Sequence, residues 1–429
     1  MESILLLVSL VVLIVLGAPI GFVLAGIPTV YILFTDTAPL LTVPYQMYQA
    51  LAHVPLVAIP FFMLTGELMN SSTITDRLLD LSRAIVGRVR GGLAQVNILT
   101  SMLFAGMNAS VVADTATVGA ILIPAMKRAG YSAPFSAAIT AVSSTIGGII
   151  PPSVAMVVLA SSANLSVGAL FSGGIIPGVM VGLGLMALTY VISVRRNYER
   201  SDQPFRIITV IRALGRASFA LIIPIVLVGG IVGGVFSSVE AGALTALTAF
   251  LVGVLIYRSL SPGEVFGAFG RAMKLSASVF VIIAAAGPFS WLLTRLGTLK
   301  LVESWLLGFA DTPWLFVVVV VAFIFVIGMV MDAVANIIVL GPLLIDICVQ
   351  AGFAEVQAAL VVIVDFLVGT VTPPIGVAYF TAAQIARAKI EQVALAMIPF
   401  ILVEVVVLYL MLIIPGMTMW FPKVFGFIN

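Results

Sequence analysis

The sequence predicts an all-α polytopic membrane protein built from two inverted-topology repeats, each with a re-entrant helical hairpin and a broken helix. Three observations support this prediction. Of the 429 residues, 62% are hydrophobic and only 9% are charged, whereas a soluble domain has roughly 25% charged residues. Apolar runs of about 20 residues, long enough to cross a bilayer as a helix, recur along the chain. Two of these runs contain a helix-breaking stretch, GGIIPPS at 147–153 and GTVTPPIG at 369–376.

The first predicted repeat covers residues 1–194. A polar loop at 35–54 separates its early apolar runs. Leucines and isoleucines that recur every three or four residues among arginines mark 72–90 as a helix in the membrane interface. The expected order is scaffold helices within 4–70 (4–16, 20–34 and 55–70), an interfacial arm at 72–90, a hairpin at 92–128 (arms 92–105 and 110–127), a broken helix at 133–163 and a helix at 168–194. A polar connector at 195–217 is predicted to be cytoplasmic.

The second predicted repeat covers residues 218–429 and has the same order. Ser237 and Glu240 form a capping-box pattern that opens one of its scaffold helices. We expect scaffold helices within 218–294 (218–234, 239–257, a short amphipathic piece at 261–274, then 275–294), an interfacial arm at 298–309, a hairpin at 313–350 (arms 313–327 and 331–350), a broken helix at 355–386 and a helix at 392–414.

The distribution of basic residues predicts the orientation. Arg88 and Arg90 precede the first hairpin, while Lys127 and Arg128 follow it, so both of its ends lie on one side of the membrane. With both hairpins re-entrant, ten crossings remain. Seventeen of the 20 basic residues then fall on the cytoplasmic side and three outside (Arg295, Lys300 and Lys423), as the positive-inside rule requires. Both termini are therefore predicted to be external, in the periplasm, and the second hairpin opens from the outside.

An internal repeat relates the two halves. A shift of 222 positions places the first Pro-Pro pair on the second and Gly147 on Gly369. The same shift, without a gap, places Gly106-Met107 on Gly328-Met329, Gly119 on Gly341, and Ala129-Gly130 on Ala351-Gly352. Inverted repeats with discontinuous helices are a feature of secondary transporters.

The breaks predict an ion site at membrane depth. Proline has no N–H, and its ring clashes with the carbonyl four residues earlier. The carbonyls expected to lose their helical partner are those of Gly147, Gly148, Gly369 and Thr370. Such carbonyls are costly in a bilayer unless they line a cavity or hold a ligand, and small hard cations take oxygen ligands. The hairpin tips can complete the shells, with Asn108 and Ser110 for one site, and Gly328, Asp332 and Asn336 for the other; Thr372 adds a hydroxyl.

Half-helix N-termini carry partial positive charge and suit an anionic substrate. The candidate substrate contacts are Ser110, Ser153, Asp332, Thr372, Gly376 and the external cation Arg295. Each has a structural alternative. The Pro-Pro pairs could merely kink their helices. The intramembrane carboxylates Asp114 and Asp332 could satisfy the backbone of their own hairpins. Arg295 could extend to the membrane interface without touching substrate.

The sequence resembles a known family, the large membrane subunit (M, or DctM-like, component) of tripartite ATP-independent periplasmic (TRAP) transporters. The resemblance covers essentially the whole chain. It is carried by IPFFMLTGELM (59–69), VADTATVGAILIPAMKRAGYS (112–132), IGGIIPPS (146–153), GGVFSSVEAGA (233–243), IGMVMDAVANIIVLGPLL (327–344) and IGV within VTPPIGV (371–377).

The resemblance implies a Na⁺-coupled importer of the bacterial inner membrane, with the ion-transporter-superfamily architecture and an elevator mechanism. It implies a carboxylate substrate, such as a C4-dicarboxylate, sialate or other sugar acid, delivered by a soluble periplasmic binding protein (P component). It also implies a small four-helix membrane subunit (Q component), here expected as a separate chain because this chain begins directly with large-subunit sequence. No organic cofactor and no nucleic acid partner are expected. Membrane lipid is expected to contact the protein.

Family sodium sites pair a hairpin tip with a proline break, and the resemblance implies at least two of them. The matching residues are Asn108, Gly147, Ile150 and Pro152 for the first site, and Gly328, Gly369, Thr372 and Pro374 for the second. One tip departs from the family: where Ser-Gly-Ser is common, this chain has Asn108-Ala109-Ser110. An amide oxygen then takes the place of a hydroxyl as the ligand.

Three other functions compete with this reading. A stand-alone ion-coupled carboxylate carrier would have the same broad architecture but need no binding protein. An intramembrane enzyme is disfavoured by the single histidine (His53), the single cysteine (Cys348) and the lack of a Gly-x-Ser-x-Gly elbow. A channel is disfavoured because two facing hairpins form an occluded site, not a continuous pore.

Overall fold

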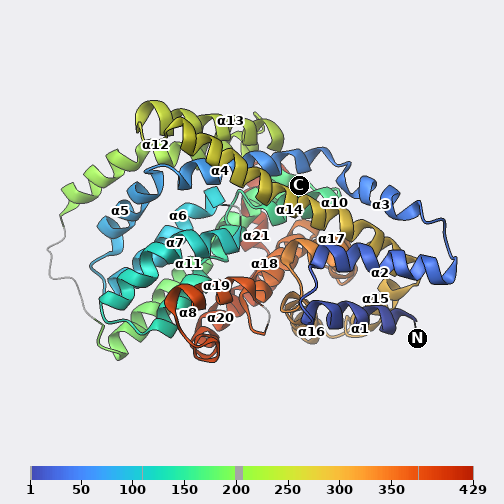
Figure 1. Cartoon of the computed structure of the whole chain (residues 1–429). Helices are drawn as coiled ribbons and strands as arrows, with labels where there is room; N and C mark the ends of the chain where they lie inside the picture. The colour runs from blue at the N-terminus through green and yellow to red at the C-terminus, as the bar shows by residue number, and fades with distance from the viewer. Residues whose placement is uncertain (1, 109, 199–205, 375, 429) are drawn as a thin grey trace.

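The computed structural model describes residues 2–108, 110–198, 206–374 and 376–428, and every element within these residues is a helix (Figure 1). The first half contains α1 (Glu2–Val15), α2 (Ile20–Thr35), α3 (Thr42–Leu51), η1 (Val54–Val57), α4 (Ala58–Asn70), α5 (Ile74–Val86), α6 (Gly92–Asn108), α7 (Val111–Arg128), α8 (Ala133–Ser143), α9 (Ile146–Ile149), α10 (Val154–Ala163) and α11 (Val167–Arg195).

The second half contains α12 (Ile207–Val232), α13 (Ser238–Leu251), η2 (Val252–Ile256), α14 (Pro262–Arg295), α15 (Thr298–Leu307), α16 (Pro313–Gly328), α17 (Ala333–Gln350), α18 (Glu355–Val371), α19 (Val377–Ala386), α20 (Ile390–Ile413) and α21 (Gly416–Val424). Capping residues set several helix starts. Ser237 with Glu240 and Ser261 with Glu264 form complete capping boxes at α13 and α14.

The predicted fold class is confirmed: the described chain forms two helical hairpins, α6–α7 and α16–α17, and two helices broken at Pro-Pro pairs. Helix bounds follow the register of 222. It places α7 (111–128) on α17 (333–350), the start of α8 (133) on that of α18 (355), and the end of α9 (149) on that of α18 (371). In Figure 1 the two hairpins lie on opposite sides of α18.

Several predicted boundaries are wrong. The loop at 35–54 contains the helix α3, and α12 begins at Ile207, inside the connector predicted at 195–217. The pieces predicted at 261–274 and 275–294 form one 34-residue helix, α14, because no residue between them breaks it. A last helix, α21, follows the predicted end at 414. The division into repeats and the cytoplasmic position of the connector stay predictions.

Six helices of the described chain are long and apolar enough to cross a membrane, or eight if each of two bent pairs is one span. One bent pair joins α3 to η1 and α4 at 70°, and the other joins α8 and α9 to α10 at 44°. The predicted ten crossings leave out α17, an arm of the second hairpin, and include the broken helix formed by α18 and α19 as well as α1 and α2. At 14 and 16 residues, these helices are shorter than the roughly 20 residues that a straight span needs.

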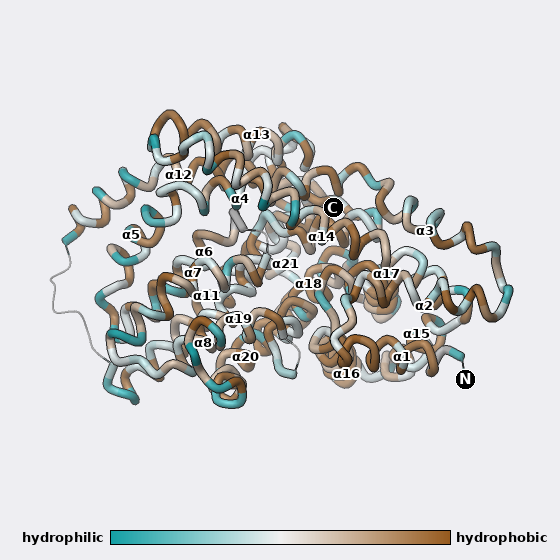
Figure 2. Tube along the Cα trace, in the orientation of Figure 1, coloured by the Kyte–Doolittle hydropathy of each residue, from teal (hydrophilic) through white to brown (hydrophobic). Residues whose placement is uncertain are grey.

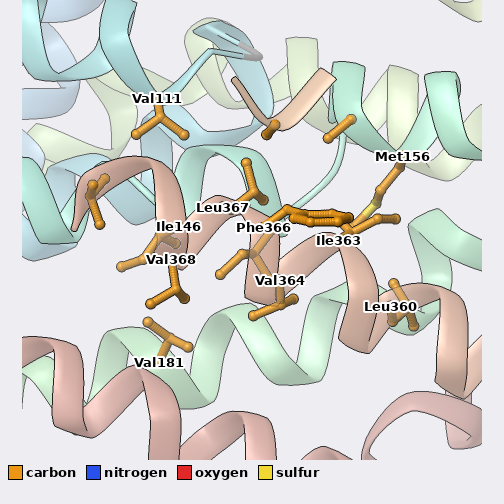
Figure 3. Close-up of a cluster of buried hydrophobic side chains, with 14 of the residues drawn as sticks. Val111, Ile146, Met156, Val181, Leu360, Ile363, Val364, Phe366, Leu367 and Val368 are labelled. Atoms are coloured by element: carbon orange, nitrogen blue, oxygen red, sulfur yellow. The ribbon is translucent and has the colours of Figure 1, made fainter. Parts of the chain in front are cut away.

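The core is centred on α18, which is buried over nearly all of its length and packs against α16, α17, α20 and α11. Figure 3 shows Val364 and Val368 of α18 facing Val181 of α11, while Phe366 points toward Met156 of α10. A second group of helices forms the scaffold: α14 packs against α2, α3 and α4, and α12 packs against α5 and α13. Glu67 of α4 pairs with Arg271 of α14 at 2.6 Å, which adds an ion pair to the packing of these helices.

Candidate functional site

The tip of the second hairpin lies against the second helix break. Gly328 is the last residue of α16, and Gly369 lies in the last turn of α18. A Cβ added to Gly369 would lie 2.6 Å from the Cα of Gly328 and 2.7 Å from its carbonyl carbon. Only glycine permits this approach. The C-terminal ends of α16 and α18, whose last carbonyl groups lack intrahelical partners, therefore meet at one point. This point lies between the hairpin tip and the helix break that the sequence analysis assigned to the second ion site.

The two breaks have the same local geometry. Each contains a cis Pro-Pro peptide bond, Pro151–Pro152 and Pro373–Pro374. The residue that ends the helix before each break is extended, with φ −79° and ψ 130° at Ile150 and φ −90° and ψ 137° at Thr372. The register of 222 relates these two residues as well.

One expectation about the free carbonyls is wrong. The Gly369 carbonyl accepts the N–H of Thr372 at 3.0 Å, because a tighter turn replaces the helical bond that proline removes. It retains one acceptor site, since a carbonyl oxygen has two lone pairs. At the first break the N–H of Ile150 donates to Ile146 at 2.9 Å, and within the described chain no backbone N–H donates to the Gly147 or Gly148 carbonyl.

A buried carboxylate lies beside the first break. A Cβ added to Gly147 would lie 3.9 Å from the Cβ of Asp114, and Asp114 accepts a hydrogen bond from Ser101 of α6 at 2.9 Å. Ser101 also lies 3.4 Å from the hydroxyl of Ser143 on α8, so the hairpin and the broken helix share one polar network. The side chain of Asn108, the predicted ligand from this tip, lies outside the described residues.

Four helices begin at one cavity of about 240 Å³. Their N-cap residues all line it: Ser110 of α7, Ser153 of α10, Asp332 of α17 and Gly376 of α19. Each half of the chain contributes one hairpin helix and one half-helix. All four residues were predicted as substrate contacts, and the structure brings them together. The opposite wall is formed by scaffold residues, among them Met63 of α4 and Ser278 and Ile282 of α14.

The converging N-termini make the cavity favourable for an anion. Each helix N-terminus presents N–H groups without helical acceptors and about half a positive charge. Asp332 is the single carboxylate among the described lining residues. Its Oδ1 accepts the N–H of Val334 at 2.9 Å, so it also caps its own helix, as the structural alternative supposed. The two roles are compatible, because one carboxylate oxygen makes the cap.

Two predicted substrate contacts lie away from this cavity. The Thr372 hydroxyl donates to the Val368 carbonyl at 2.7 Å, and Thr372 lines a separate apolar pocket between Phe325 and α20. Arg295 donates to the Thr37 carbonyl at 2.7 Å and stacks on Trp291 at the end of α14, the position expected if it extends to the interface. Substrate contact by either residue stays a prediction.

Sequence reasoning missed Glu404. This residue of α20 is fully buried and accepts a hydrogen bond from the hydroxyl of Thr145, the residue that precedes α9. A lone glutamate in the apolar run ILVEVVVL (401–408) was the signal that could have found it, because an ionisable residue inside a membrane helix is a functional candidate.

The buried carboxylates occupy different positions in the two halves of the chain. The register of 222 places Asp114 on Asn336 and Ser143 on Asp365, so each half has one carboxylate at this pair of positions, on different helices. Asp365 is fully buried, and neither of its carboxylate oxygens has a hydrogen-bond partner among the described residues. The Oδ1 of Asn336 is likewise buried and unpartnered within that part of the chain.

Comparison with known proteins places these features in a family. Residues 7–417 match the family described as tripartite ATP-independent periplasmic transporter, DctM component. The isethionate TRAP transporter permease protein DctMQ of Oleidesulfovibrio alaskensis is 34% identical, over 95% of this chain and 64% of its own length. The sialic acid TRAP transporter large permease protein SiaM of Vibrio cholerae is 29% identical, over 95% of this chain and 96% of its own. The chain thus spans less than two thirds of the first relative and nearly all of the second.

A solved structure has the same fold. The YdaH transporter of Alcanivorax borkumensis, whose crystal structure reveals an unusual topology, matches with a TM-score of 0.65 over 88% of each chain, at 15% identity. At this identity the likeness concerns the fold alone.

Proposed function

Because the chain belongs to the DctM family of TRAP transporters, we propose that it is the large membrane subunit of a Na⁺-coupled importer of an organic acid. The observation that carries this proposal is the convergence of four helix N-termini on one cavity. Transport is the activity of the family, and the chain is therefore no enzyme.

The substrate we propose is a carboxylate, such as a C4-dicarboxylate, a sialate or another sugar acid. Support comes from the cavity, where Ser110 and Ser153 offer hydroxyl groups beside backbone N–H donors. The relatives named above act on isethionate, a sulfonate, and on sialic acid, a carboxylate. Both are anions, which suits helix N-termini. The apolar part of the wall, Met63 and Ile282, then faces the remainder of the substrate.

We propose that sodium binds at the two contacts between hairpin tip and helix break. The residues present fit an alkali ion, because the carbonyl ends of α16 and α18 meet at Gly328 and Gly369 with no side chain between them, and oxygen ligands suit small hard cations. The proposed ligand residues are Asn108, Gly147, Ile150 and Pro152 for one ion and Gly328, Gly369, Thr372 and Pro374 for the other. Sodium is cargo here, and it neutralises part of the substrate charge during the crossing.

We propose an elevator movement for the crossing itself. The cavity lies between two groups of helices: hairpins and broken helices on one side, and α4 and α14 of the scaffold on the other. A substrate bound there touches both groups, so sliding of the first group against the scaffold would carry it across the bilayer. In this proposal the chain lies in the bacterial inner membrane with both termini in the periplasm.

The partners we propose are a small four-helix membrane subunit as a separate chain, and a periplasmic binding protein that delivers the substrate. The name of SiaM, large permease protein, supports the presence of a small subunit in the complex. The alternative is a stand-alone carrier that needs no binding protein.

Reconstitution tests the proposal. The purified chain with its small subunit, in proteoliposomes under an inward sodium gradient, should take up labelled substrate only when the binding protein is added outside. Replacing the gradient by an equal potassium gradient should abolish uptake. Uptake at low substrate concentration without the binding protein would favour the stand-alone carrier, and uptake that ignores sodium would contradict the coupling.

A further inference from the structure

A second cavity, unrelated to the substrate site, lies between the interfacial arm and the scaffold. It has a volume of about 640 Å³ and is bounded by α5 with the turn after it, by the start of α6, and by the first turns of α12. Five arginines line it: Arg77, Arg83, Arg88, Arg212 and Arg216. Asp80 is the single acidic residue among the described lining residues. The cavity therefore has a formal surplus of positive charge.

Internal contacts hold the arginine cavity in shape. Arg77 stacks its guanidinium 3.7 Å over the ring of Tyr257 and donates to the carbonyl of Arg216 at 3.2 Å. The hydroxyl of Tyr257 donates to the same carbonyl at 2.8 Å. These bonds join α5, α12 and the end of η2. They use the backbone of Arg216 and leave its side chain available.

Three of the five arginines have no acidic partner within the described protein. Asp80 pairs with Arg83 at 3.5 Å, with both side chains about half exposed. Arg77, Arg212 and Arg216 make no ion pair with any residue that the structure describes. Arginines kept together without acidic partners repel one another, and their guanidinium groups match phosphate geometry well.

The surroundings of the cavity match the edge of a bilayer. α5 is amphipathic, with Leu78 buried against α12 of the scaffold and Leu79 buried against the first hairpin, and α12 is a candidate span that begins at Ile207. Next to the arginines, both helices expose large apolar side chains, Ile85 on α5 and Ile208 and Ile211 on α12. Figure 2 shows hydrophilic and hydrophobic stretches alternating along these two helices. Basic pockets beside lipid-facing helices bind anionic headgroups.

We propose that the arginine cavity binds the phosphate headgroup of an anionic phospholipid. Arg212 and Arg216 contact the phosphate, while the acyl chains lie on the exposed isoleucines. Such a lipid links α5 to α12 and fixes the interfacial arm on the scaffold, against which the substrate-carrying helices would move. A free phosphate ion offers the same charge without the chains, so the test must separate the two sources.

The test measures thermal unfolding of the whole detergent-purified chain with its small subunit. Phosphatidylglycerol, phosphatidylcholine and inorganic phosphate are added separately. We expect phosphatidylglycerol to raise the melting temperature, and the Arg212→Gln/Arg216→Gln variant to require roughly 10- to 30-fold more of it. The contact between α5 and α12 survives in this variant, because it uses the Arg216 carbonyl. The control, Arg195→Gln/Lys274→Gln, removes two exposed charges outside the cavity and should respond like the unmodified protein.

Three results would overturn the proposal. Equal stabilisation by phosphatidylglycerol and phosphatidylcholine would show that no anionic headgroup is recognised. An unchanged lipid requirement in the arginine variant would place the lipid elsewhere. Full stabilisation by millimolar inorganic phosphate, with no further gain from phosphatidylglycerol, would identify a free anion as the ligand. If the variant fails to purify, native mass spectrometry of the unmodified protein, with and without competing phosphatidylglycerol, identifies the lipids that it retains. Retention of no anionic phospholipid would then overturn the proposal.

Discussion

Gly328 and Gly369 touch backbone to backbone, and this contact joins the second hairpin to the second broken helix. A Cβ on Gly369 would lie 2.6 Å from the Gly328 Cα, whereas a Cβ on Gly328 would lie 3.1 Å from the Gly369 Cα. The neighbouring atoms are backbone, so no rotamer change can make room. The spacing of the tip and the break, and with it the proposed second ion site, therefore depends on the absence of two side chains.

Gly369→Ala should abolish sodium-driven uptake and lower stability by about 1–3 kcal/mol, the usual cost of overpacking. The hairpin tip must move away from the break, which separates the proposed ligands. Gly270→Ala is the matched control, since a Cβ there meets nothing within 4 Å. Uptake and thermal unfolding of both variants in parallel check the prediction. Normal uptake by Gly369→Ala would show that transport does not require the contact between the hairpin tip and the helix break.

Pro152→Ala and Pro374→Ala should weaken sodium dependence more than expression. Alanine restores a backbone N–H and permits the helix to continue through the break, so fewer carbonyl groups remain for an ion. The half-saturating sodium concentration of uptake is the measurement. Pro224→Ala, which removes a proline from inside the scaffold helix α12, serves as the control. An unchanged half-saturating sodium concentration in both break variants would contradict the assigned ion sites.

Two substitutions of Asp332 separate its structural role from its functional role. Asparagine is as good an N-cap as aspartate, whereas alanine at an N-cap costs about 1 kcal/mol. Asp332→Asn should therefore keep the bond to the Val334 N–H and normal stability, yet lower uptake, because the second hairpin tip loses the carboxylate predicted to help hold the second ion. Asp332→Ala should lower both. Wild-type uptake by Asp332→Asn would leave this residue a purely structural cap.

Much of the fold could be predicted because its signals are local. A Pro-Pro pair ends a helix because proline lacks an N–H and clashes with the preceding turn, and the next helix starts a few residues later. Ser110, Ser153 and Gly376 were therefore identified from sequence as helix starts. The register of 222 then related the two halves, so helix bounds found in one half predicted those of the other.

The errors arose where polarity was taken as the end of a helix. The arginines at 212 and 216 look like a connector, yet residues 207–217 contain no proline, and α12 runs through them. Gly263, Gly267 and Gly270 did not interrupt α14. Contacts between distant elements could not be predicted at all. The hydrogen bond from Thr145 to Glu404 and the arginine cavity depend on how helices pack, which no local pattern encodes.

Glu404 should tolerate a neutral side chain of the same shape but not truncation. Glu404→Gln keeps an oxygen that can accept from Thr145, so stability and uptake should stay close to those of the unmodified protein. Glu404→Ala leaves the buried Thr145 hydroxyl without this partner and opens a space between α20 and α9, at a cost of about 1–3 kcal/mol. Thermal unfolding separates the two variants. Loss of uptake in a stable Glu404→Gln variant would instead show that the charge itself is required.

Lys127 connects the two halves of the chain. Its ammonium group donates to the carbonyl of Ala386 at 2.6 Å, and Ala386 is the last residue of the half-helix α19. A cation at a helix C-terminus contributes about 0.3–1 kcal/mol at an exposed position and up to about 2 kcal/mol when partly buried. Lys127→Met should lower stability within that range and reduce uptake, because the end of α19 would lose its hydrogen bond to the first hairpin. Lys127→Arg retains a cationic donor and should restore most of both. Arg128→Gln changes the neighbouring charge, and equal effects of Arg128→Gln and Lys127→Met on uptake would trace the loss to general electrostatics and not to this bond.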